Sequence, residues 1–193
     1  MANMNAPFGF RPVRRDDAAA VNYALSTRLI DPANVTPIGK GDLVKSTSTG
    51  FIELATPGGT RATGIFWGCT YYDTAQQRVQ WMNQWPGVNT TEGDIVAYIL
   101  DDPRMLFEAQ VTGASPVTVA DIGNNIDIAA GTITHAGFSG MSVNFATIAT
   151  TATLPFRIVG LSQGVGNGYD ATAQYNRVLV RLNAVDATTT TGL

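Results

Sequence analysis

Histidine, cysteine and charge are all scarce in this chain, and each scarcity argues against a class of function. His135 is the only histidine and follows no nucleophile-elbow motif, so we expect a loop or surface residue, not a member of a hydrolytic triad. Cys69 is the only cysteine, which excludes an intrachain disulfide and a cysteine-based zinc cluster. Its apolar neighbours predict a buried and inert thiol. We therefore expect a chain that is not an enzyme and has no cofactor or metal.

The low charge also limits the partners. Only 14% of the residues are charged, whereas an ordinary soluble domain has about a quarter. The net charge of −3, with Lys40 and Lys45 as the only lysines, argues against direct nucleic-acid binding. No apolar run approaches the roughly 18 to 20 residues of a membrane-spanning helix, so we expect no membrane contact. A surface with few charges instead favours association with copies of itself or with a partner protein.

The hydrophobic pattern predicts an all-β fold. Residues 94–100 are apolar on both faces, as in a central strand. Residues 105–111 and 177–183 alternate with period two, as strands do. Residues 41–45 and 51–55 flank a turn that ends at Gly50, which predicts a hairpin. Few stretches show a helical period of adequate length.

Composition divides the chain into an N-terminal arm, a body and a tail. We expect an extended arm over residues 1–20, a single β-rich domain over residues 21–186 and a flexible tail over residues 187–193. Within the body, residues 112–153 are rich in Thr, Ala, Gly and Asn and predict an excursion from the main sheet. Its expected short strands lie near residues 117–119, 126–128 and 141–145.

Other polar and aromatic groups have simple structural interpretations. Asp101 and Asp102 precede a proline, which is turn chemistry, so a metal or glycosidase role with Glu108 is the weaker reading. Residues 160–168 are rich in glycine but match no phosphate-binding loop. The chain also has three tryptophans among its expected strands, which favours core or interface packing over a sugar or base platform: Trp67, Trp81 and Trp85.

The arm itself is suited to contact a surface. Phe8 and Phe10 are aromatic anchors, and two prolines preset an extended backbone. Three arginines, Arg11, Arg14 and Arg15, have no acid before them to offset their charge. Such a segment could lie along a partner and lose little entropy.

Several segments, in this order, resemble the capsid cement or decoration proteins of tailed double-stranded DNA bacteriophages. The resemblance runs over most of the chain and depends on the order of the segments, since no single one is diagnostic. The segments are residues 5–12 (NAPFGFRP), 41–45 (GDLVK), 64–73 (GIFWGCTYYD), 85–86 (WP), 97–103 (AYILDDP), 107–110 (FEAQ), 156–161 (FRIVGL) and 178–183 (VLVRLN).

The resemblance implies a structural protein that binds the outer surface of an icosahedral phage head after expansion, and that is made in the host cytoplasm. Its partner would be the major capsid protein, and it would self-associate as a dimer or trimer. We expect a compact β-barrel or jelly-roll-like body, with a β-tulip as the alternative. The candidate capsid contacts are Phe8, Phe10, Arg11, Arg14 and Arg15. A minor head or tail protein is the leading alternative function, and a carbohydrate-binding module using the tryptophans with Asp101, Asp102 or Glu108 is a further one.

Overall fold

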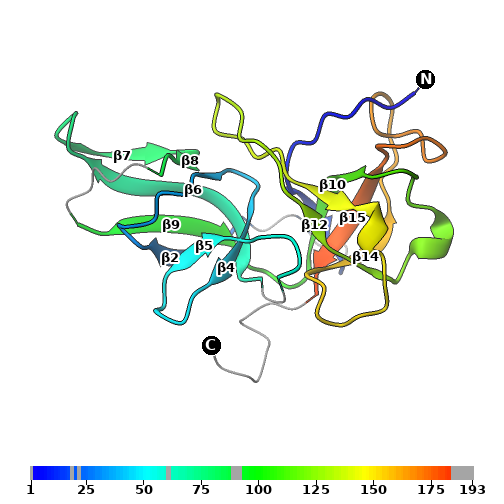
Figure 1. Cartoon of the computed structure of the whole chain (residues 1–193), viewed down its shortest axis with the longest axis horizontal. Coiled ribbons are helices and arrows are strands. Elements are labelled where there is room, and N and C mark those ends of the chain that lie inside the picture. The colour runs from blue at the N-terminus through cyan, green and yellow to red at the C-terminus, as the bar shows by residue number, and fades with distance from the viewer. Residues whose placement is uncertain (1, 18–19, 21–22, 60–61, 88–92, 184–193) are drawn as a thin grey trace.

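Strands dominate the secondary structure of this protein. The computed structural model describes residues 2–17, 20, 23–59, 62–87 and 93–183. In these ranges the helices are two three-residue 3-10 helices, η1 (Val119–Asp121) and η2 (Phe145–Thr147). Among the described residues, no helix is long and apolar enough to cross a membrane. The predicted all-β class is confirmed, and Figure 1 shows the strands gathered in two groups side by side.

The first group forms a closed barrel. Its strands follow the order β4 (Leu43–Ser46), β5 (Ile52–Leu54), β2 (Ser26–Ile30), β9 (Ile95–Leu100), β6 (Gly64–Asp73) and β7 (Arg78–Met82). A further pairing between β4 and β6 closes this path into a ring, and β7 lies outside the ring on the second half of β6. Of the architectures predicted for the body, the barrel is therefore the one present.

Some strands of the barrel contribute side chains to two cores. Val44 and Ile99 belong to the core inside the barrel, whereas their neighbours Leu43 and Leu100 belong to a second core shared with the other sheet. Successive side chains of a strand point to opposite faces, so the same strands serve both cores. On β9, predicted as a central strand, Ala97 and Ile99 are in the core inside the barrel and Leu100 is in the second core, and the strand pairs with β2 on one side and β6 on the other.

Two local predictions in the barrel are confirmed. β4 and β5 form the expected antiparallel hairpin, and Gly50 in its turn has a φ of 86°, a conformation that glycine adopts without strain. A small two-stranded sheet of β3 (Ile38–Gly39) and β8 (Gln84–Trp85) adds Ile38 and Trp85 to the core inside the barrel.

The second group is a seven-stranded sheet. Its main path is β11 (Asn125–Ile126), β14 (Phe156–Leu161), β15 (Arg177–Leu182), β10 (Met105–Thr112), β13 (Ser142–Asn144) and β12 (Ile128–Ala129). The strand β1 (Arg11–Arg15) pairs antiparallel with the first half of β10, and β13 pairs parallel with its end. The alternation predicted for β15 is confirmed, since Val178, Val180 and Leu182 are buried.

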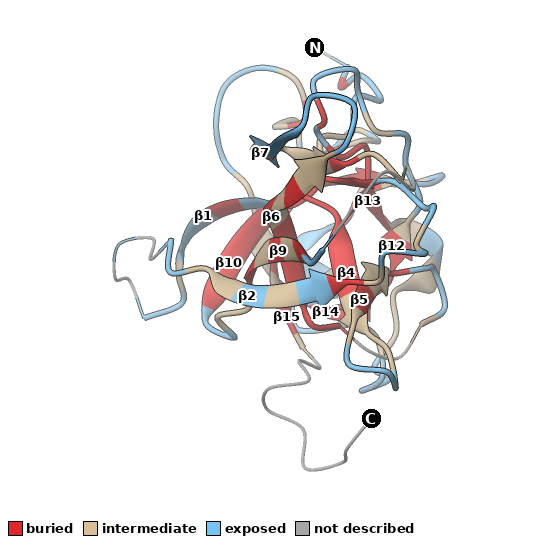
Figure 2. Cartoon of the chain, turned by 90° about the vertical axis from the view of Figure 1, so that its left-hand side faces the viewer, coloured by how far each residue is buried: buried red, intermediate tan, exposed pale blue. Residues whose placement is uncertain are grey.

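The strand β10 is buried more completely than its period-two pattern indicates. The predicted apolar face is in the core, but Glu108 and Gln110 on the opposite face are buried as well. Gln110 donates to the carbonyl of Met4 and accepts from the amide of Ala6, so the N-terminal segment lies across this face. Figure 2 shows β10 as a continuous buried band beside β1.

The N-terminal arm is extended, as predicted, but it is packed into the body. The side-chain amide of Asn3 donates to the carbonyl of Asp170 at 2.8 Å and its oxygen accepts from the amide of Gly168 at 2.9 Å. Phe10 is 1% exposed, and its ring stacks on Phe156 with centroids 4.3 Å apart. Residues 2–15 are thus part of the fold, because they supply core side chains and a strand.

The Thr- and Gly-rich residues 112–153 supply strands to the second sheet. Of the three expected strands, the one at 141–145 is present as β13, and the one at 126–128 is divided into β11 and β12. The one at 117–119 is absent: Val117 is a buried coil residue that leads into η1. The predicted tail at 187–193 and the arm boundary at 18–19 and 21–22 lie outside the described residues.

Candidate functional site

The groups most often used in catalysis are occupied or isolated. The thiol of Cys69 is fully buried on β6, as predicted, and burial raises its pKa to about 12. His135 lies exposed in a turn, as expected. In the described ranges no three His, Cys, Asp or Glu side chains come together as a metal site would require.

The three carboxylates considered as an acid, base or metal set are engaged separately. Asp101 accepts from the hydroxyl of Ser26 at 2.8 Å, and Asp102 pairs with Arg15 at 2.7 Å. Glu108 accepts from the hydroxyl of Ser162 at 2.6 Å and lies 3.4 Å from a guanidinium nitrogen of Arg177. Each therefore has a structural partner.

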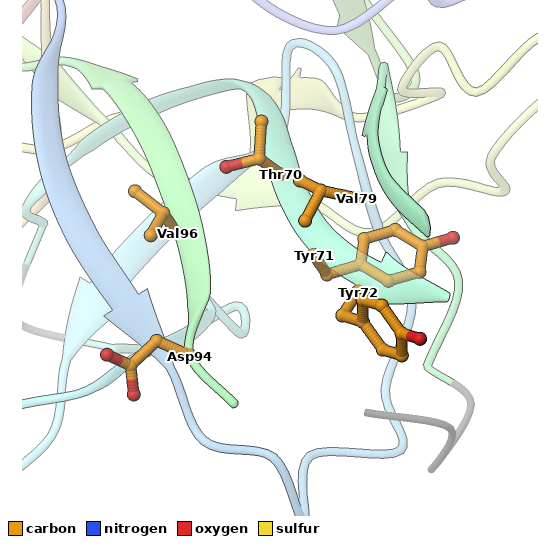
Figure 3. Close-up of a pocket in the computed structure, with 6 residues that line it drawn as sticks. All are labelled: Thr70, Tyr71, Tyr72, Val79, Asp94 and Val96. Atoms are coloured by element: carbon orange, nitrogen blue, oxygen red, sulfur yellow. The ribbon is translucent and has the colours of Figure 1, made fainter. Parts of the chain in front are cut away.

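A shallow hollow lies on the outer face of the barrel. It has a volume of about 410 Å³ and is lined from β6, β7 and the start of β9, as Figure 3 shows. Asp94 is the single charged residue of this lining. The hydroxyl of Tyr71 donates to the sulfur of Met82 and accepts from the side-chain amide of Gln80. The other polar lining residues of the hollow are Thr70 and Tyr72.

A second cavity, the cation-aromatic groove, lies where the arm, the barrel and the second sheet meet. Its volume is about 380 Å³. It combines aromatic rings and two cations, supplied by segments far apart in the sequence. Its lining residues are Phe8, Phe10, Arg11, Pro12, Lys40, Gly41, Trp67 and Phe138.

A β-bulge directs Trp67 into this groove. The register of β6 against β9 shifts between Phe66 and Gly68, so Trp67 is the extra residue. Phe66 and Cys69 therefore both point into the barrel although they are three positions apart, and Trp67 is turned outward. The exposed ring of Tyr23 lies 5.6 Å from the Trp67 ring and extends the aromatic surface.

Lys40 forms the cationic wall of the groove. Its amide donates to the carbonyl of Gly137 at 2.8 Å, and its carbonyl accepts from the amide of Ser139 at 2.9 Å, which fixes its backbone. The ammonium group lies 3.8 Å above the Trp67 ring, a cation-π contact. Partial burial lowers the pKa of Lys40, because removal from water disfavours the charged form.

Phe8 and Arg11 form the opposite rim. The guanidinium groups of Arg11 and Arg177 lie 4.5 and 4.7 Å from the centroid of the Phe8 ring. The buried Glu108 offsets part of this charge, at 3.4 Å from Arg177 and 3.8 Å from Arg11. The side chain of Arg11 is nevertheless 57% exposed, so it presents charge to solvent at the rim.

The five predicted contact residues differ in their exposure and in their partners. Phe8 and Arg11 line the groove with exposed atoms, whereas Phe10 forms its buried wall and has no free face to insert into a partner. Arg14 is exposed on β1, and Arg15 is held by Asp102 and Asp17. The interpretation of Phe10 as a surface anchor is thus corrected by its packing.

The sequence does not indicate which side chains join Phe8 and Arg11 in the groove. Trp67 stood out as a tryptophan and Lys40 as one of only two lysines, but no spacing in the sequence connects them with the arm. Phe138 carried no signal in its Gly-rich segment. Only the folded chain brings these three side chains to the arm.

The three tryptophans do not form one platform. Trp85 is fully buried, and its indole N–H donates to the carbonyl of Asn34 at 3.0 Å. Trp81 is 48% exposed and packs against Tyr98 on the outer face of the barrel. Trp67 lies in the groove. Core packing, one of the two predicted roles, is confirmed for Trp85, whereas Trp67 is half-buried and Trp81 is exposed.

Comparison with known proteins gives no relative. No family model matches the chain, and no curated protein or solved structure is significantly similar to it.

Proposed function

We propose that this protein is a structural cement protein of a tailed bacteriophage. It binds the outer surface of the expanded icosahedral head and bridges neighbouring subunits of the major capsid protein. The sequence segments described above resemble those of decoration proteins and follow one another in the same order, which supports this proposal. The low fraction of charged residues supports it as well. In this role the chain acts by binding alone, without catalysis or a cofactor.

The cation-aromatic groove is the observation that carries the proposal. Aromatic and arginine side chains dominate the energy of protein interfaces, and the groove presents both on a fixed backbone. Each bound copy would add an interface that must break before neighbouring subunits can part under the pressure of packaged DNA. Many such sites on one shell act together through avidity.

Self-association belongs to the same proposal. The outer face of the barrel exposes Val79 at 70% and Trp81 at 48%, close to Leu29 and Tyr98 on the same sheet. An exposed apolar face of this kind supports contact between copies of the chain. Sedimentation velocity of the purified chain is expected to show a dimer or trimer, and a monomer at all accessible concentrations would remove this part of the proposal.

Co-sedimentation with undecorated shells tests the capsid role directly. The full chain is expected to bind expanded shells saturably and to raise their resistance to heat, while unexpanded shells serve as the control and bind less. Deleting residues 1–15 is not a suitable variant, because Phe10 and β1 belong to the folded body. If the full chain does not bind expanded shells, the cement role is refuted, and another virion component such as a minor head or tail protein becomes the better candidate.

A further inference from the structure

Lys40 is a partly buried cation that lacks a carboxylate partner in the described part of the chain. The other lysine, Lys45, pairs with Glu53 at 3.0 Å, whereas Lys40 contacts the face of Trp67. A cation-π contact compensates only in part for lost hydration. An anion brought to the open side of the groove would complete the compensation.

The remaining walls of the groove are aromatic and partly exposed to solvent. Phe138 is 44% exposed although it is a large aromatic residue, and Trp67 and Phe8 are only partly covered. The backbone around Lys40 is fixed by hydrogen bonds to Gly137 and Ser139. Binding would therefore order few additional groups, which favours affinity.

We propose that the groove binds an extended acidic segment of the capsid subunit, with an Asp or Glu carboxylate on Lys40 and a neighbouring apolar side chain against Trp67 and Phe138. The volume of about 380 Å³ is suited to a few side chains, not to a folded element. The identity of this partner rests on the proposed function, whereas its chemistry rests on the charge and aromatic lining of the groove.

Charge complementarity favours a carboxylate-bearing protein segment over a nucleic acid. The groove offers Lys40 and the rim residue Arg11, whose charge Glu108 partly offsets. The chain as a whole carries a net charge of −3. Two cations on an acidic protein can hold one carboxylate but would give only weak binding to a polyanion, which depends on many phosphate contacts.

Chemical protection of Lys40 is the first test, and it uses the unaltered chain. The free chain and the chain bound to expanded shells are treated with an N-hydroxysuccinimide ester of acetic acid, and acetylation of each lysine is measured by peptide mass spectrometry. Lys40 is expected to be protected on binding, while Lys45, paired with Glu53, serves as the internal control. Equal acetylation of Lys40 in the free and bound chain would overturn the inference.

Matched variants supply the second test. Lys40→Gln is expected to weaken binding to shells about 10- to 100-fold per site, as loss of a hydrogen bond to a charged group does. Lys45→Gln removes the same charge elsewhere and is expected to change binding by less than about twofold. Lys40→Arg is expected to restore part of the affinity. Equal loss in the Lys40 and Lys45 variants would refute a specific role for the groove.

The outcomes separate this inference from the proposed function. If the full chain binds shells and Lys40→Gln binds equally well, the groove assignment fails and the cement role stands. If the full chain does not bind shells at all, the cement role itself is refuted. If Lys40→Gln instead changes the oligomeric state without shells, the occupant is a second copy of the chain, and the capsid segment is ruled out. Competition of shell binding by double-stranded DNA would also contradict a carboxylate ligand.

Discussion

Replacing Phe10 with alanine tests whether the N-terminal arm is part of the folded core. The ring of Phe10 is 1% exposed and stacks on Phe156 with centroids 4.3 Å apart. Loss of a buried phenylalanine removes its transfer free energy and leaves a cavity, which costs about 3 to 5 kcal/mol. For a chain of this size, that loss corresponds to a fall in Tm of about 6 to 20 °C.

Urea and thermal unfolding, followed by circular dichroism and tryptophan fluorescence, measure this cost. Phe8→Ala is the matched control, because it removes the same side chain two residues earlier from a position that is only half-buried. We expect it to cost less than half as much. If Phe10→Ala lowers the free energy of unfolding by less than about 1 kcal/mol, a value ordinary for surface changes, then the arm is not packed as described.

Three further perturbations test other parts of the structure. Burial raises the pKa of Asp42, so the folded state holds the proton more tightly than the unfolded state does, and the stability that this gives is lost as the pH rises through the folded pKa. Asp42→Asn should therefore flatten the fall in Tm as the pH rises above the ordinary range of an aspartate, and parallel Tm profiles of the two proteins would contradict this. The thiol of Cys69, with a pKa of about 12, should resist iodoacetamide in the native chain and react once urea unfolds it, so rapid native alkylation would show that the strand opens. Gly9 has a φ of 75°, and a Cβ at this position would lie 2.6 Å from Cβ of Ser139, so Gly9→Ala should destabilise the chain by well over about 1 kcal/mol. Gly50→Ala is the control and should cost less, because the space around Gly50 is open. Equal losses of unfolding free energy in the two variants would count against the close approach of the arm to Ser139.

Local signals in the sequence predicted the elements that depend on local chemistry. The hairpin around Gly50 follows from a turn residue that accepts positive φ, and the alternation of β15 follows from the two-residue repeat of a strand. The apolar run of β9 correctly indicated a central strand. These patterns need no knowledge of distant residues.

The sequence was less informative where polar residues are buried by distant segments. Glu108 and Gln110 look like the solvent face of an amphipathic strand, but the arm and its hydrogen bonds cover them. The strand expected at 117–119 is absent, since Val117 is held by Asn176, whose amide bonds both its N–H and its carbonyl. The strand propensity of a short segment contains no information about hydrogen-bond partners that lie far away in the sequence.

What the sequence by itself determined is the all-β class and the burial of Cys69, because these depend on residue types and short-range periodicity. The tertiary structure decided that the arm belongs to the core and that Phe8 and Arg11 face Lys40, Trp67 and Phe138 across one groove. The physical reason is chain connectivity: Lys40, Trp67 and Phe138 lie 29, 56 and 127 positions after Arg11. Side-chain contacts over such separations depend on how the strands pair and leave no periodic trace in the sequence.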